Sequence, residues 1–207
     1  LAGGVVVFLS RVTRPPADTE TLTLTAGAGA INFDAAVGAT ALGAAQIVTA
    51  GNVGIDSTFD AASFTQSAGT GTTTFDGALT ATTGDVSITT NAIELNALVD
   101  TVTAGAGGTV TLNADTGALT IASTGDIDSD GAVSLTGTTG ISTAGNITTT
   151  GDNIDFNSAV LLTGAVDLIT ADGNVAFDST LDGAQNLDIS AGAGTICLLY
   201  TSPSPRD

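Results

Sequence analysis

Three aspartates at alternating positions are the strongest candidates for metal chemistry in this sequence. Asp126, Asp128 and Asp130 are followed by Gly131, and an apolar residue comes two positions later. Alternating carboxylates, a glycine at the sharp turn and an apolar eighth residue are features of a helix–loop–helix calcium site. The twelfth position of such a site is a bidentate glutamate, but here it is Gly137, and no helix-forming segment flanks the motif. The pattern therefore excludes that calcium site and leaves two interpretations, a looser calcium site at a turn and a solvated acidic turn.

Carboxylates could also serve carbohydrate chemistry, because most glycoside hydrolases use a pair of them. Polysaccharide lyases instead need a basic residue as base or charge stabiliser, and the stretch 17–196 contains no Lys, Arg or His. The chain also has no Trp and a single Tyr, although sugar clefts are commonly lined by aromatic side chains. We therefore expect no enzyme, and assign no catalytic or cofactor-binding residue. A carboxylate-based polysaccharide-active enzyme is the alternative.

Charge narrows the classes of partner. The net charge is −18, and the only basic residues are Arg11, Arg14 and Arg206. All three lie outside 17–196, which holds every acidic residue except Asp207, 20 of the 21. Such a surface repels phosphates and anionic lipid, so we expect no nucleic-acid partner. Mean hydropathy is +0.40, which is too apolar for a disordered tail, yet no apolar run reaches the length of a membrane span.

The elements that must position these residues are repeated short strands. An apolar–any–apolar motif, usually followed by Asp or Asn, recurs, for example as Ile31–Val37, Val53–Phe59 and Ile154–Val160. Its nine copies begin at residues 6, 31, 53, 73, 93, 110, 133, 154 and 175. Alternation with period two indicates strands with one buried face, and a unit of about 20 residues buries that face only by stacking on its copies.

The repeats predict an all-β fold, a parallel β-helix or solenoid of about nine imperfect coils of roughly 20–21 residues, spanning 1–196. A β-sandwich is the competing architecture, but its strands do not repeat one motif nine times. In the solenoid, the residue after the second apolar position stacks on its counterpart in the next coil. Asp34, Asp56 and Asp76 then form a row of carboxylates, which we expect Asn96, Asn113, Thr136 and Asn157 to continue.

The repeats resemble those of filamentous-haemagglutinin-like exoproteins, which are bacterial surface proteins exported by two-partner secretion or as autotransporters. The resemblance covers 6–196 and rests on the phrases TLTLTAGAGAINFDAAVG (21–38), GTTTFDGALTAT (71–82) and GNVAFDSTLDGAQNLDISAGAG (173–194). It implies a right-handed β-helix that is secreted or held at the bacterial cell surface, outside the outer membrane, with no membrane span in this segment.

The resemblance also implies a function. We expect a structural stalk or adhesin repeat segment that acts in adhesion, surface spacing or biofilm. The partners would be a host or neighbouring cell surface, a glycan or matrix, and an outer-membrane transporter used for export. A calcium-stabilised structural repeat, as in surface-layer-type proteins, is a further alternative, with calcium as the one cofactor considered.

The last eleven residues differ from the rest in composition. Residues 197–207, CLLYTSPSPRD, contain the only Cys, the only Tyr and two of the four Pro. They resemble the translation of a common transposase sequencing adapter, a kind of segment that is excluded from reasoning about the fold. We therefore expect 1–196 to be an interior piece of a longer repeat protein and 197–207 to be a non-native tail.

Overall fold

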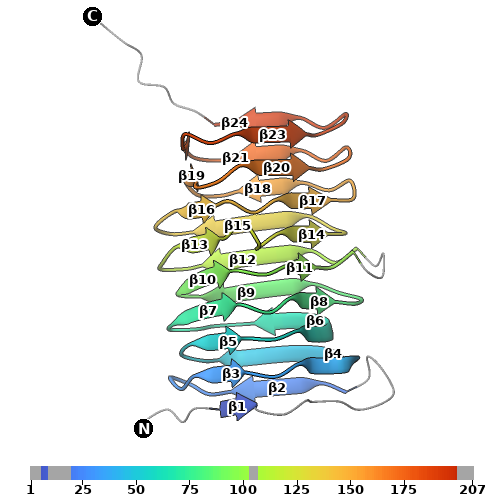
Figure 1. Ribbon diagram of the computed structural model, residues 1–207, viewed down its shortest axis with the longest axis vertical. Helices are drawn as coiled ribbons and strands as arrows, with labels where there is room; N and C mark the ends of the chain where they lie inside the picture. Colours follow the sequence, from blue (N-terminus) through green and yellow to red (C-terminus); the bar gives the residue numbers. More distant parts are fainter. Residues whose placement is uncertain (1–5, 9–19, 103–106, 200–207) are drawn as a thin grey trace, which may run out of the picture.

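The computed structural model describes residues 6–8, 20–102 and 107–199, which form a parallel β-solenoid with no helix among them. Its coils are stacked along the long axis of the molecule, and each coil contributes strands to three faces (Figure 1). The predicted all-β parallel solenoid is confirmed.

Face one is a nine-stranded sheet in which every pairing is parallel. Because its nine strands are separated by eight steps along the chain, the predicted number of about nine coils is close. The strands are β1 (Val6–Phe8), β3 (Ile31–Phe33), β5 (Val53–Ile55), β7 (Thr72–Phe75), β10 (Ala92–Leu95), β13 (Leu119–Ile121), β16 (Ile141–Thr143), β19 (Val160–Leu162) and β22 (Leu181–Asp182).

Faces two and three belong to a second sheet of 15 strands, because β4 (Val37–Thr49) and β6 (Phe59–Gln66) continue round the corner between them. Face two continues with β8 (Leu79–Ala81), β11 (Val99–Asp100), β14 (Ile127–Ser129), β17 (Ile147–Thr149), β20 (Val166–Ile169) and β23 (Leu187–Ser190). Face three contains β2 (Leu22–Thr25), β9 (Val86–Thr90), β12 (Val110–Ala114), β15 (Val133–Gly137), β18 (Ile154–Phe156), β21 (Val175–Phe177) and β24 (Ile196–Leu198).

The repeat phase expected from the sequence is correct for the first five copies and wrong for the last four. Copies beginning at 6, 31, 53, 73 and 93 pair in succession on face one. The next strand on that face is β13, whose Leu119 pairs with Ile93, whereas Val110 pairs with Val86 on face three. The 17-residue step from 93 to 110 is therefore less than one coil, and the motif moves to another face.

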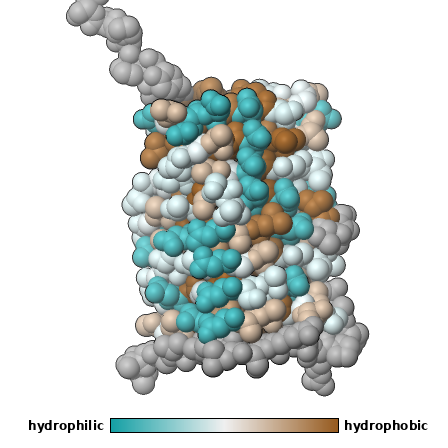
Figure 2. All heavy atoms as spheres, viewed as in Figure 1, coloured by the Kyte–Doolittle hydropathy of each residue, from teal (hydrophilic) through white to brown (hydrophobic). Residues whose placement is uncertain are grey.

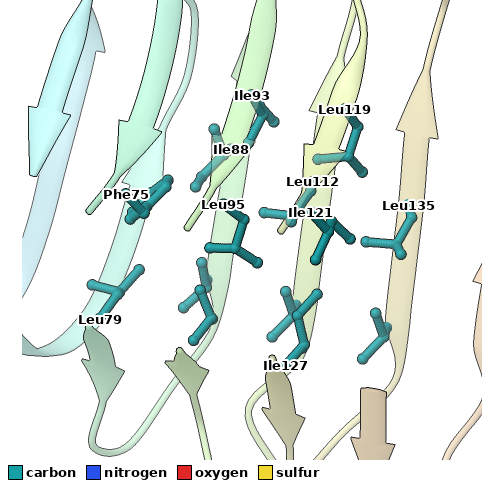
Figure 3. Close-up of a cluster of buried hydrophobic side chains, with 14 of the residues drawn as sticks. Phe75, Leu79, Ile88, Ile93, Leu95, Leu112, Leu119, Ile121, Ile127 and Leu135 are labelled. Atoms are coloured by element: carbon teal, nitrogen blue, oxygen red, sulfur yellow. The ribbon is translucent and has the colours of Figure 1, made fainter. Parts of the chain in front are cut away.

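The core fills the space between the three faces with stacked aliphatic and phenylalanine side chains. Residues such as Leu95, Leu112 and Ile127, one from each face, point toward one another and are at most 1% exposed (Figure 3). Burying each such side chain contributes about 1.5 to 3 kcal/mol. Aromatic contacts link neighbouring coils at both ends of the molecule, including an edge-to-face contact between Phe33 and Phe59 and a stacked contact between Phe156 and Phe177.

The corners require small residues because adjacent coils approach closely there. A Cβ added to Gly77 would lie 2.1 Å from the carbonyl oxygen of Ser57 in the preceding coil. Gly192 has a φ of +58°, and Ala171, which precedes it by one coil at the same kind of corner, has the same left-handed φ. Coil length varies because the corners vary, and paired residues on face one lie 19 to 26 positions apart.

The structure bears on two further expectations, the end of the repeats at residue 196 and the absence of a membrane span. Strand β24 crosses the expected boundary at residue 196, since Cys197 and Leu198 pair with Ala176 and Phe177. These bonds use backbone groups, which every residue except proline can supply, so the origin of residues 197–207 stays a prediction. In the described part of the chain, no helix is long and apolar enough to cross a membrane.

Candidate functional site: acidic and amide ladders on the solenoid surface

The Asp34–Asp56–Asp76 row exists as predicted, and it lies at the corner between faces one and two. Each residue follows a face-one strand, and paired strands place its neighbours one coil away, about 4.8 Å distant. Asn96 continues the row by donating its amide to Oδ1 of Asp76 at 2.8 Å. Figure 2 shows hydrophilic residues gathered along the long axis on the visible side of the molecule.

The other residues expected to continue this row lie elsewhere, because the repeat motif changes face before residue 110. Asn113 and Thr136 pair with one another on face three, and the amide of Asn157 donates to Thr136 Oγ1 at 3.2 Å. They form a second, uncharged ladder on face three, in later coils than the acidic row. The expectation of one continuous ladder is therefore wrong.

Within the acidic row, Asp56 is the residue whose pKa is shifted. Burial, the charges of Asp34 and Asp76, and a side-chain hydrogen bond with Asp34 all raise the pKa of Asp56 above its usual value. Next to the row, the surface of face one is hollowed where Gly54 has no side chain, and Asn52 and Thr74 line this hollow together with two of the aspartates. Asp56 can therefore bind a proton more tightly than an isolated carboxylate.

The structure does not gather the three candidate calcium ligands into one site. Asp126 Oδ1 accepts the backbone N–H of Asn146 at 2.7 Å, and Asp130 Oδ1 accepts the hydroxyl of Thr150 at 2.9 Å. Asp128 lies between them in β14 and is paired with Asp100 in the preceding coil. Within the described ranges, no group of three or more His, Cys, Asp or Glu side chains could hold a metal ion.

Asp128 is nevertheless the aspartate of this motif whose pKa is shifted. Burial is the largest cause of the raised pKa, and the charges of Asp100 and Asp126 raise it further. A hydrogen bond from Thr148 lowers it. Calcium binding at these residues stays a prediction. Calorimetric titration of the wild type and Asp128→Ala with millimolar calcium tests it, and equal heats for the two proteins would eliminate this binding site.

A third ladder, which was not anticipated, consists of Asn and Asp residues at or just before strand starts. The side-chain oxygen of each accepts the backbone N–H of the equivalent residue one coil later. Asp126 accepts from Asn146, and Asn146 in turn accepts from Asp167 at 2.9 Å. The same bond joins Asn52 to Thr72, Asp85 to Thr109, Asn153 to Asn174 and Asn174 to Thr195.

This capping ladder has a sequence signal. A Gly–Asn or Gly–Asp pair stands directly before an apolar residue at 51–53, 84–86, 125–127, 145–147 and 173–175. Because the capping oxygen satisfies an amide at a corner, where the sheet bonds are interrupted, Asn or Asp is favoured there. Asp126 therefore has a structural role that the calcium-like spacing conceals.

Comparisons with protein-family models, with curated proteins and with solved structures found no match to this chain.

Proposed function

We propose that this chain is a rod-shaped structural segment of a secreted bacterial surface protein, in which it acts as a stalk that carries adhesive parts away from the cell. The observation that carries the proposal is the unbroken parallel pairing on all three faces, together with one continuous apolar core. Each coil therefore adds a fixed length of about 4.8 Å to the molecule. The acidic surface and the resemblance of the repeats to filamentous-haemagglutinin-like proteins support a place outside the cell.

A stalk and an adhesive surface predict different binding. Beads coated with the purified chain should bind host cells, bacterial cells and immobilised glycans no better than beads coated with an unrelated acidic protein. Small-angle scattering should in parallel give an elongated particle. Saturable binding to one cell type or glycan, competed by soluble chain, would replace the stalk with an adhesin, and a compact particle would contradict the rod.

A further inference from the structure

The outer surface of face three differs in charge from the rest of the molecule. Six strands in succession, from β2 to β15, present one column of outward residues whose register is given by their pairing: Thr23, Gln46, Thr65, Ser87, Thr111 and Ser134. A second column beside it contains Thr89, Asn113 and Thr136. All nine side chains are exposed or half-buried. We call this surface the neutral face.

The neutral face is bounded by charge. Its first column reaches its first carboxylate at Asp155, the residue that pairs with Ser134 in the next coil. Asp85 and Asp115 lie at the strand ends on its two sides, before β9 and after β12. Face two carries carboxylates in the corresponding outward positions at Asp60, Asp100 and Asp128. On face one, Glu94 interrupts the outward column, and the Asp34–Asp56–Asp76 row lies along its edge.

We propose that the neutral face is a lateral self-association surface that pairs with the same face of a second copy of this chain. Charge selects the face: in a chain of net charge −18, contact through face two opposes several carboxylates, and contact through face one opposes Glu94 and the neighbouring acidic row. Contact through the neutral face brings hydroxyl and amide groups together and leaves the carboxylates at the rim.

Geometry selects the partner. A second copy has the same repeat of about 4.8 Å along its axis, so the side-chain columns of two parallel or antiparallel rods remain in step over all six strands, as in stacked sheets with polar ladders. Strands of five residues across six coils cover about 17 Å by 29 Å, or roughly 1,000 Å² in total for two copies. That area is at the lower end of specific interfaces, so the association is weak and becomes stronger when salt screens the rim carboxylates.

Sedimentation equilibrium of the full chain under reducing conditions tests this at low and high salt. We expect a monomer–dimer equilibrium that shifts toward dimer with salt. Thr65→Asp combined with Thr111→Asp should raise the dissociation constant at least tenfold, because these residues lie two coils apart in the first column. Thr120→Asp combined with Leu161→Asp adds the same charge to exposed positions two coils apart on face one, and should change the dissociation constant less than twofold. A monomeric wild type, or equal effects of the two pairs, overturns the proposal.

A crosslinking measurement is independent of any folding defect in the charged variants. In a Cys197→Ser background, Thr111→Cys places a thiol on the neutral face and Ser142→Cys places one on face one, each with little change in size. Mild oxidation should give disulfide-linked dimers of Thr111→Cys much faster than of Ser142→Cys. Equal rates would contradict the proposal, as would a neutral polysaccharide that binds the face while the chain alone stays monomeric. The rod shape of the monomer is measured separately, so the proposed stalk and this interface can fail independently.

Discussion

At the scale of single residues, the acidic row couples stability to pH. The pKa of Asp56 is raised in the folded chain, chiefly by burial and then by Asp34 and Asp76. A carboxyl group whose pKa is higher folded than unfolded favours folding below its unfolded pKa, and this contribution is lost as pH rises through the folded pKa. At neutral pH the charged Asp56 therefore lowers the stability of the fold.

Replacing the central carboxylate should relieve this repulsion. We expect Asp56→Asn to raise the melting temperature at pH 8 by about 1 to 3 °C and to flatten its dependence on pH between 4 and 8. Thermal melts by circular dichroism at several pH values measure this. Asp115→Asn is the matched control, because its neighbours one coil away, Asn91 and Thr138, are uncharged. A lower melting temperature for Asp56→Asn would show that the row holds the corner together.

A corner residue gives a second prediction at this scale. Ala171 and Gly192 share a φ of +58°, a conformation that costs an L-residue with a side chain about 1 kcal/mol or more. Ala171→Gly should therefore stabilise the chain by about 0.5 to 1 kcal/mol.

The reverse change at the equivalent position supplies the comparison. Gly192→Ala should be destabilising, because its Cβ would also lie 2.0 Å from the carbonyl oxygen of Ala171. Urea unfolding of both variants measures the change in unfolding free energy, which should be positive for Ala171→Gly and negative for Gly192→Ala. A destabilised Ala171→Gly would show that this corner does not hold its left-handed conformation in solution.

At the scale of the elements, the strands are held in register by the capping ladder as well as by the sheets. Asn146→Ala removes the acceptor of the Asp167 N–H and should lower local stability by about 1 kcal/mol. Amide hydrogen exchange should show faster exchange at Asp167. The Thr195 amide, which is bonded to Asn174 Oδ1, is the internal control and should be unchanged. Equal protection of the Asp167 amide in the wild type and in Asn146→Ala would show that the side-chain oxygen of Asn146 does not cap this amide.

The strands themselves could be predicted from the sequence, whereas their assignment to faces could not. Alternation such as Val53–Gly54–Ile55 shows which residues point inward, and the structure buries Val53 and Ile55. All three faces demand this same alternation, so the pattern does not say which face a strand occupies. Corner length decides that, and the long coil from Ile93 to Leu119 moves the motif to another face.

The candidate site, too, could be predicted from the sequence only in part. The Asp34–Asp56–Asp76 row was predictable because it lies within copies that keep their phase. Asp126, Asp128 and Asp130 have a spacing typical of calcium ligands, but that spacing also follows from a strand with polar outward residues. The partners of Asp126 and Asp130, Asn146 and Thr150, are each 20 residues away, and the spacing within the motif does not reveal them.

At the scale of the whole molecule, the coil is the unit that can be removed. Ile141 and Val160 pair on face one, so deletion of 141–159 joins equivalent points of successive coils. The neighbours of the removed strands should then pair with one another, giving a folded rod that is shorter by about 4.8 Å. Scattering and circular dichroism measure length and strand content.

A deletion of half that length is the control. Removing 141–150 joins non-equivalent points and should unfold the coils that follow. If the full-coil deletion unfolds as completely as the half-coil deletion, the coils are not interchangeable units.

The change of face has a consequence for how such a gene can grow. The phrase Leu22–Ile31 turns from face three to the start of face one, and its near copy Leu187–Ile196 turns from face two to the start of face three. Both copies fold, so two of the three corners accept closely similar residues. Unequal recombination between copies is therefore not restricted to whole coils. A duplicated stretch as short as one strand and one corner can enter the gene, rotating everything encoded downstream by one face while the interior stays packed.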